Sequence, residues 1–217
     1  TSGPGATNLI TGIATAYMDS IPLIALTGQV SSNLLGRDIF QEVDISGAVT
    51  PFIKHSYIVK NAKDIPRVVK EAFHIASTGR KGPVVVDIPK NCQDPRYRFA
   101  YEPNSEIHLR SYNPTVTGHR GQVRRAVKAI CAARRPVLLC GGGVVQADAA
   151  EELRELAGRL NLPVAVTLMG IGAFPAASPQ YLGMVGLHGL YEANLAMHHS
   201  DLVFTVAVRF DDRVTNS

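Results

Sequence analysis

Asp87 and Lys90 are the first candidates for chemistry, because they end an apolar run that predicts a buried strand. Residues 83–86 are rich in valine, and β-branched side chains suit a parallel strand that is covered on both faces. Pro83 can open such a strand but cannot occupy its centre. Ligands of open α/β sheets bind outside the carboxyl ends of the strands, so chemistry could happen at both residues. The alternative is a surface lysine that follows a core strand.

A Gly/Pro turn at residues 1–8 leads into a helix whose apolar positions recur every three and four residues. Its glycines permit a backbone path closed to larger residues, and the helix start offers unpaired N–H groups to an anion or a ring nitrogen. Phe40 and Gln41 fall where a polar loop enters a second predicted helix at residues 37–42, on the ligand side of the sheet. The alternatives are a core anchor for Phe40 and a capping position for Gln41.

Glycines at positions 141–143 directly follow the apolar segment 136–140 and precede a predicted helix. Such glycines let a phosphate approach backbone N–H groups at a helix start. The run is not the dinucleotide fingerprint G-x-G-x-x-G, because Gln146 occupies the sixth position and Thr167, which is not acidic, ends the next predicted strand. An NAD-dependent dehydrogenase is therefore disfavoured.

A cluster of charges closes the chain: Asp211 and Asp212 lie between Arg209 and Arg213, which should keep both carboxylates ionised and ion-paired. We expect ligand or structural contacts from these residues. The adjacent histidines at 198–199 cannot share one face of a helix, which argues against metal ligation.

The three cysteines, Cys92, Cys131 and Cys140, are widely spaced and form no C-x-x-C pair. This pattern indicates a reducing compartment and no zinc, so we expect no metal site in this chain. Cys140 ends an apolar strand and is expected to be a small buried hydrophobe, with a reactive thiol as the alternative.

Length and composition favour two modest α/β domains for the 217 residues, of which 46% are hydrophobic and 18% charged. No apolar run approaches the roughly 20 residues needed to span a bilayer, so no membrane segment is expected. The formal net charge is +4, with a basic cluster in a predicted amphipathic helix near residues 119–135. That helix has no aromatic residue to interleave with its charges, which argues against nucleic-acid binding.

Alternating apolar runs and helical periods predict an α/β fold with parallel sheets flanked by helices, in two domains that are each incomplete. Residues 93–117 lack any period and should form an interdomain linker draped over one of the domains. In both halves the polar or glycine-rich segments follow strands. The remaining predicted elements are strands at 22–28, 56–59, 163–167 and 202–208 and helices at 64–79, 147–160 and 190–199. In the helix at 147–160, Leu153, Leu156 and Leu160 should face inward. The apolar positions of the basic helix are Val123, Ala126, Val127 and Ile130.

Several motifs together resemble the catalytic large subunit of acetolactate synthase, also called acetohydroxyacid synthase, a thiamine-diphosphate-dependent family. The resemblance covers essentially the whole chain, and the run Arg-Phe-Asp-Asp-Arg-Val-Thr is its most specific part. The motifs lie at residues 1–8, 27–30, 40–42, 82–90 and 209–215.

The resemblance implies that residues 1–92 are the rear part of a pyrimidine-binding domain and residues 118–217 the front part of a central FAD-binding domain. Since the chain begins with Thr1, we expect a fragment of a longer enzyme. The family's catalytic glutamate would then precede Thr1, and the domain that holds Mg²⁺ and the diphosphate would follow Ser217. The fragment alone should be inactive.

The implied reaction decarboxylates pyruvate and joins the two-carbon unit to a second pyruvate or to 2-ketobutyrate, which begins branched-chain amino-acid biosynthesis. The implied enzyme is a homodimer or larger assembly with a possible small regulatory subunit. It would be cytoplasmic in a bacterium and plastid or mitochondrial in a eukaryote. Other thiamine-diphosphate enzymes, such as a pyruvate oxidase or a glyoxylate carboligase, are the nearest alternatives. A non-catalytic FAD- or NAD-binding module is a more distant one.

By the same resemblance, Pro4, Asn8 and Gln41 line the thiamine diphosphate pocket, while Phe40 and Lys90 border the substrate channel. The flavin is implied to be structural, since the net reaction moves no electrons. Its implied contacts are Arg80, Gly141, Gly142, Gly143, Thr167, Leu168, Met169, Val185, Gly186, Leu187, His188, Arg209, Asp211, Arg213 and Val214.

Two positions depart from the family's pattern, which commonly has glycine where this chain has Ala207 and Asn216. Ala207 adds a methyl group where backbone and ligand would approach closely, which puts flavin affinity in doubt more than identity.

Overall fold

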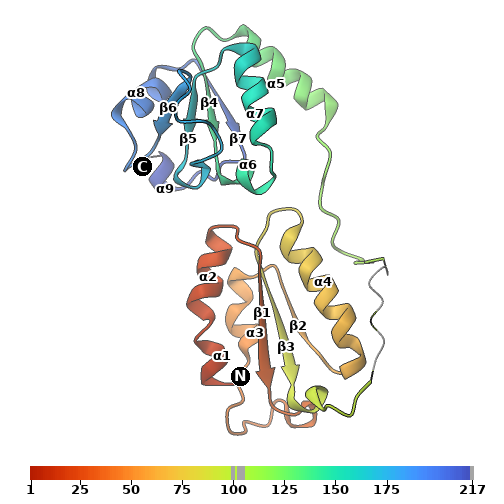
Figure 1. Cartoon of the computed structure of the whole chain (residues 1–217). Helices are drawn as coiled ribbons and strands as arrows, with labels where there is room; N and C mark the ends of the chain where they lie inside the picture. Colours follow the sequence, from red (N-terminus) through yellow and green to blue (C-terminus); the bar gives the residue numbers. More distant parts are fainter. Residues whose placement is uncertain (99–100, 102–105, 216–217) are drawn as a thin grey trace. The chain divides into compact units, whose positions relative to one another are not determined.

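The computed structural model describes residues 1–98, 101 and 106–215. The chain divides into two compact units, Thr1–Thr117 and Gly118–Ser217, which we describe separately (Figure 1). Among the described residues, no helix combines the length and the apolar character that a membrane span requires. Both units are α/β, as the sequence predicts.

The sheet of the first unit is parallel and has the strand order β1-β3-β2. Its strands are β1 (Leu23–Gln29), β2 (His55–Ile58) and β3 (Pro83–Pro89). Central strand β3 is the predicted valine run, and Val84, Val85 and Val86 are fully buried. The predicted strand therefore occupies the middle of the sheet with cover on both faces.

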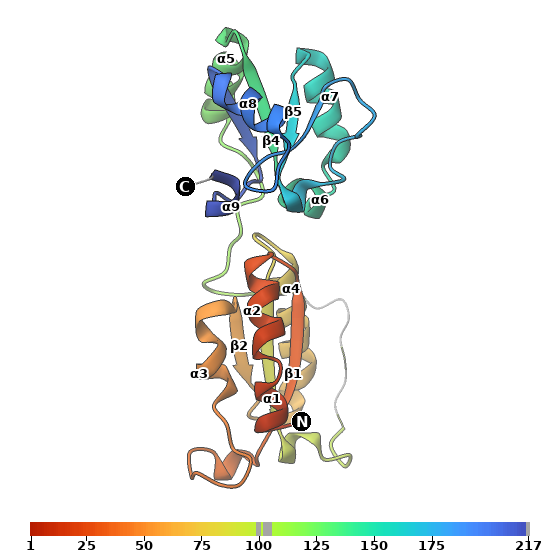
Figure 2. The ribbon, with the colours of Figure 1, turned by 90° about the vertical axis from the view of Figure 1, so that its left-hand side faces the viewer.

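Helices cover both faces of this sheet (Figure 2). On one face, α1 (Pro4–Thr7), α2 (Ile10–Met18) and α3 (Ile45–Val49) supply a cluster in which Ile13 and Ile45 surround Val85. On the other face, α4 (Ile65–Ser77) packs Val68, Ala72 and Ile75 against Val84 and Val86. The alternation of β3 side chains between the two clusters follows from the two-residue period of a strand.

The second unit has a parallel sheet with the strand order β6-β5-β4-β7. Core side chains of β4 alternate between two clusters, Leu138 and Cys140 on one face and Val137 and Leu139 on the other. The first cluster includes residues of the helices α5 and α7, and the second includes Ala193 of α8. The strands are β4 (Pro136–Cys140), β5 (Val164–Val166), β6 (Tyr181–Met184) and β7 (Leu202–Val206), and the helices are α5 (Arg120–Ala132), α6 (Gly142–Gln146), α7 (Ala150–Leu160), α8 (Tyr191–His199) and α9 (Asp212–Thr215).

Residues 37–42 were expected to enter a helix, but they form a loop, and the next helix, α3 (Ile45–Val49), begins only at Ile45. Asp44 is the residue that starts it: its carboxylate accepts a hydrogen bond from the Gly47 N–H at 2.8 Å. Asp38 and Gln41 have positive φ angles of 55° and 60°, which a helix does not allow.

Three smaller predictions in the second unit also need correction. Helix α7 starts at Ala150 rather than at residue 147, because Asp148 adopts a φ of 54° and breaks the helix. Leu160 was expected to point inward but is exposed at the end of α7. In α5, Val123 and Val127 are about half exposed, so Ile130 is the described α5 side chain that enters the core. Strand β6 was not predicted at all.

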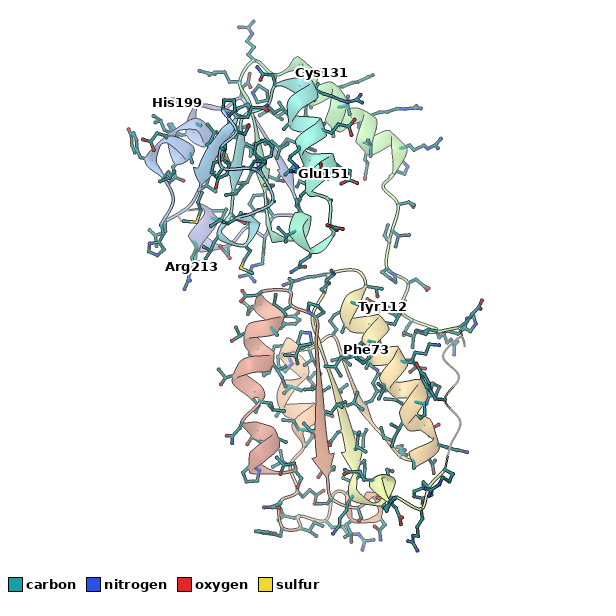
Figure 3. The ribbon with its side chains drawn as sticks, viewed as in Figure 1. Phe73, Tyr112, Cys131, Glu151, His199 and Arg213 are labelled. Atoms are coloured by element: carbon teal, nitrogen blue, oxygen red, sulfur yellow. The ribbon has the colours of Figure 1, made fainter. Side chains whose placement is uncertain are left out.

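The segment after β3 lies against the first unit where it is described. Leu109 and Tyr112 pack beside the core under α4, and the Tyr112 hydroxyl donates to the Thr78 carbonyl at 2.8 Å. Lys54 Nζ donates to the same hydroxyl at 2.9 Å and to the Thr78 carbonyl at 2.7 Å (Figure 3 labels Tyr112). Residues 99–100 and 102–105 of the predicted linker lie outside the described residues.

Candidate functional site

The amino-terminal turn meets the loop of Gln41 at the carboxyl edge of the first sheet. The Gly28 N–H, near the end of β1, donates to the Thr1 carbonyl at 2.8 Å and holds the turn there. Gly3 then lies against Gln41: a Cβ on Gly3 would be 2.9 Å from the Gln41 carbonyl oxygen. Gly3 also has a φ of 53°, so both space and backbone conformation require glycine here.

This contact places the turn that carries Pro4 and Asn8 against the loop that carries Gln41, the three residues expected to line a thiamine pocket. Pro4 follows Gly3, and Asn8 lies one helical turn later, where its backbone N–H donates to the Pro4 carbonyl at 3.2 Å. The side chains of Pro4, Asn8 and Gln41 are all exposed. Within the described part of the chain, no side-chain hydrogen bond is seen for Asn8 or Gln41. Their exposed amide groups can therefore offer a donor and an acceptor to a ligand.

The two expected channel residues lie at the same edge of the sheet. Phe40 precedes Gln41 and is 88% exposed, which excludes the alternative that it is a core anchor. Lys90 follows β3 in the short 3₁₀ turn Lys90–Gln93 and is also exposed. The next residue, Asn91, accepts a hydrogen bond from the Ser32 N–H at 2.8 Å and so joins this turn to the loop after β1.

Asp87 differs from its neighbours because its carboxylate is buried, at 1% exposure. Oδ1 accepts from the Thr27 hydroxyl at 2.7 Å and Oδ2 accepts from Gln29 Nε2 at 2.9 Å. Burial raises the pKa of Asp87, and these two donors partly oppose that rise. The side chain is therefore closed to a substrate, and the sequence reasoning missed its partners Thr27 and Gln29.

In the second unit, the loops that follow the strands are bonded to one another at the carboxyl edge. The Gly141 N–H donates to the Val206 carbonyl at 3.0 Å, and the Thr167 N–H donates to the Cys140 carbonyl at 3.0 Å. The Leu187 N–H donates to the Arg213 carbonyl at 2.9 Å. All four strands thus contribute to one continuous edge that carries the residues expected to contact a flavin.

This edge exposes large apolar side chains beside cationic ones. Leu168, Met169, Leu187 and Phe210 are 46–67% exposed, and Arg213 is exposed on α9 (Figure 3). Arg209 and Asp211, two further residues expected to contact the flavin, form an ion pair with Arg209 Nη2 and Asp211 Oδ2 3.0 Å apart. An exposed apolar patch with arginines suits a ligand that has a flat ring and an anionic part.

Arg80 is the one expected flavin residue that belongs to the first unit. It precedes β3, where its Nε donates to the Ser20 hydroxyl at 2.9 Å and its guanidinium lies 5.4 Å from the centre of the Tyr17 ring. The second unit alone therefore does not bring Arg80 to the other expected flavin contacts.

Two hollows of the described surface lie away from both edges. One of about 540 Å³ is lined by His74, Tyr112 and their neighbours, and one of about 890 Å³ lies near the amino ends of β4 and β5. Among the described residues, no group of three or more His, Cys, Asp or Glu side chains could hold a metal ion. The candidate sites are thus open edges of two sheets.

The residues present fit both expected cofactors. At the first edge, neutral amides at Asn8 and Gln41 suit the polar atoms of an aminopyrimidine ring. At the second edge, the exposed apolar side chains suit an isoalloxazine ring and Arg213 suits a phosphate.

Comparison with known families gives matches at both ends of the chain. Residues 1–48 match "Thiamine pyrophosphate enzyme, N-terminal TPP binding domain", and residues 123–217 match "Thiamine pyrophosphate enzyme, central domain".

Curated relatives match over the whole chain. The acetolactate synthase large subunit of Haemophilus influenzae is 57% identical over 217 residues, which are 100% of this chain and 38% of that protein. The isozyme 3 large subunit of Escherichia coli is 55% identical with the same coverage, and the Corynebacterium glutamicum large subunit is 52% identical over 99% of this chain and 34% of that protein. The chain thus spans little more than a third of the length of these relatives. It belongs to the thiamine pyrophosphate enzymes and is homologous, from its first residues to its last, to the large subunits of acetolactate synthase.

Proposed function

We propose that this chain is the part of an acetolactate synthase catalytic subunit that supplies one wall of the thiamine diphosphate site and much of a structural flavin site. The similarity to acetolactate synthase large subunits over the whole chain, at 52% to 57% identity, is the observation that carries the proposal. The enzyme decarboxylates pyruvate and joins the two-carbon unit to pyruvate or 2-ketobutyrate. This is the first common step of branched-chain amino-acid biosynthesis.

At the first edge, each expected residue has a task that its position supports. The amides of Asn8 and Gln41 bind the polar edge of the pyrimidine ring, and Pro4 packs against it. When bound, thiamine diphosphate supplies the carbon nucleophile that attacks the ketoacid. Phe40 keeps water from the channel, while the ammonium group of Lys90 attracts the carboxylates of the substrates.

At the second edge, Leu168, Met169 and Leu187 cover the flavin ring and Arg213 binds its phosphates. The flavin holds the site in shape, because the net reaction moves no electrons. Mg²⁺ and the diphosphate are held by a domain outside this chain, in a protein that works in the cytoplasm as a homodimer or larger assembly with a small regulatory subunit.

A chimaeric enzyme tests the proposal. The 217 residues of this chain replace the matching segment of the E. coli isozyme 3 large subunit, which is 55% identical to it. The chimaera should form acetolactate from pyruvate, require added thiamine diphosphate, and bind FAD without reducing it during turnover. Replacing Gln41 by Ala in the chimaera should raise the KM for thiamine diphosphate, since the ring loses a hydrogen-bonding partner.

The unmodified E. coli subunit is the control. A folded chimaera that consumes oxygen and bleaches its flavin would favour a pyruvate oxidase instead. A folded chimaera that binds FAD but has no thiamine-dependent activity would favour a nucleotide-binding module and would overturn the proposal.

A further inference from the structure

The buried carboxylate of Asp87 is the centre of a small polar cluster that the reaction itself does not use. Asp87 and Thr27 are direct neighbours across the β1–β3 pairing, and Gln29 lies two residues further along β1. Thr27 and Gln29 are 3% and 7% exposed, so all three side chains are shielded from water. Hydrogen bonds to a shielded carboxylate are strong, and an unpaired partner there is costly.

Gln29 extends this cluster to the loop that carries Phe40 and Gln41. Its Nε2 donates both to Asp87 Oδ2 at 2.9 Å and to the Val43 carbonyl at 2.7 Å. Its Oε1 accepts from the Val30 N–H at 2.9 Å. The two amide hydrogens and the amide oxygen of Gln29 are thus each engaged, which fixes the orientation of the side chain.

The loop has a separate internal fastening. Glu42 accepts hydrogen bonds from the N–H groups of Gly36 and Ile39, which close residues 36–42 on themselves. That fastening shapes the loop, whereas the Val43 carbonyl joins it to the end of β1. Gly3 of the amino-terminal turn packs against Gln41 in the same loop.

We propose that Asp87 is a positioning residue: by orienting Gln29, it fixes Val43 and thereby holds Gln41 against the amino-terminal turn. An effect of Asp87 on cofactor binding rests on the proposed thiamine site. Its role in holding the loop does not depend on that site. Asp87 orients the Gln29 Nε2 group, which donates a hydrogen bond to the Val43 carbonyl. Any change that makes the Gln29 amide flip therefore breaks this bond and releases the loop.

Asp87→Asn tests this inference with almost no change in shape. The new asparagine keeps an oxygen for the Thr27 hydroxyl but presents an NH₂ group to Gln29 Nε2, so that two donors face each other. Gln29 can relieve this by exchanging its amide oxygen and nitrogen. The Val43 carbonyl then faces an oxygen, and the Val30 N–H loses its acceptor. Hydrogen exchange of the full chain should become about tenfold faster in residues 36–43, with no comparable change in α4, because a hydrogen bond to a charged group is lost.

Two further variants separate positioning from general stability. Thr27→Val removes the other hydrogen bond of Asp87 but leaves Gln29 in place, so exchange in residues 36–43 should change less than about twofold. The double variant Asp87→Asn, Gln29→Glu restores a hydrogen bond between positions 87 and 29 with reversed polarity. This double variant should recover the melting temperature, but hydrogen exchange in residues 36–43 should stay fast. The new carboxylate at position 29 has no hydrogen to donate to the Val43 carbonyl.

Unchanged exchange in residues 36–43 of Asp87→Asn would overturn the inference. So would an equal rise in α4, or full recovery of the loop in the double variant, because either would make Asp87 a general stabiliser of the sheet. In the chimaeric enzyme, Asp87→Asn should raise the KM for thiamine diphosphate more than it lowers kcat. A released loop with an unchanged KM would leave the positioning role standing and count against the thiamine site instead.

Discussion

Ala207 directly follows β7 and has a backbone conformation that L-amino acids avoid. Its φ is 54°, in the left-handed region where glycine is favoured, and it lies beside the glycine loop after β4. The methyl group is also close to that loop: a Cβ on Gly143 would be 2.6 Å from the Ala207 Cβ. We therefore predict that Ala207→Gly stabilises the second unit.

The size of the effect follows from two opposing terms. Removing the left-handed strain of one alanine gains about 1.5 kcal/mol. The greater freedom of glycine in the unfolded chain costs about 0.7 kcal/mol. The net gain is about 0.8 kcal/mol, which corresponds to about 4 °C in the melting temperature of a unit of about 100 residues.

Ala147→Gly is the matched control, because Ala147 is exposed and has an ordinary φ of −87°. Ala147→Gly relieves no strain and only increases the freedom of the unfolded chain, so it should lower the free energy of unfolding by about 0.7 kcal/mol. The free energy of unfolding is measured from native-state hydrogen exchange of the most protected amides of β4, so that only the second unit is reported. If both variants lose stability equally, Ala207 carries no strain and the reasoning fails.

Three further predictions concern side chains outside the candidate sites. Tyr112→Phe removes the hydroxyl that joins Lys54 to the end of α4 and should lower the free energy of unfolding of the first unit by about 1–2 kcal/mol in urea titrations. The loop closed by Glu42 should loosen as the pH falls below the ordinary glutamate value of 4.5, seen as faster pepsin cleavage in residues 36–42 of protein held at the acid pH. With a thiol reagent at pH 8, exposed Cys131 should react first, because burial raises the pKa of Cys140 to about 11.

The direction of the Glu42 effect follows from its hydrogen bonds. The N–H groups of Gly36 and then Ile39 bind the charged carboxylate and lower its pKa. The folded loop binds fewer protons than the unfolded chain, so its stability is fully present above 4.5 and is lost as the pH falls through the folded pKa. Glu42→Gln should remove this pH dependence; an unchanged acid transition in that variant contradicts the assignment.

The other two predictions have equally direct controls. Tyr97 is exposed, so Tyr97→Phe should leave stability unchanged, and an equal loss in both tyrosine variants would refute the role of the Tyr112 hydroxyl. Reaction of Cys140 in native protein as fast as Cys131 would refute its burial in the second core.

Apolar runs bounded by glycine or proline were enough to predict most strands, because buried parallel strands are short, β-branched and continuous. Strand β6 escaped this reasoning, since it has four residues and Gly183 at a φ of 94° interrupts its pairing with β5. The helix expected at 37–42 failed for a different reason. The polar residues at 37–42 suit the first turn of a helix, but the helix begins further along the chain, where Asp44 caps it.

The sequence also marks which residues end strands, but not which way their side chains turn. Asp87 and Lys90 are three residues apart and looked alike as candidates, yet one is buried and the other exposed. The difference comes from Thr27, 60 residues away in the chain, which only the β1–β3 register brings opposite Asp87. A register is a property of the whole sheet, so no local pattern could have assigned these partners.

The glycines at 141–143 show how a motif can be correctly located and still be weak evidence for its ligand. A Cβ on Gly142 would be 2.8 Å from the Met169 Cβ, and one on Gly141 would collide with the Ala207 carbonyl. The packing of neighbouring loops therefore requires small residues here whether or not a phosphate binds. The case for a flavin depends instead on the exposed Leu168, Met169 and Arg213, which the fold does not need. Substitutions of those side chains, rather than of the glycines, can change ligand affinity without disturbing the edge that holds them.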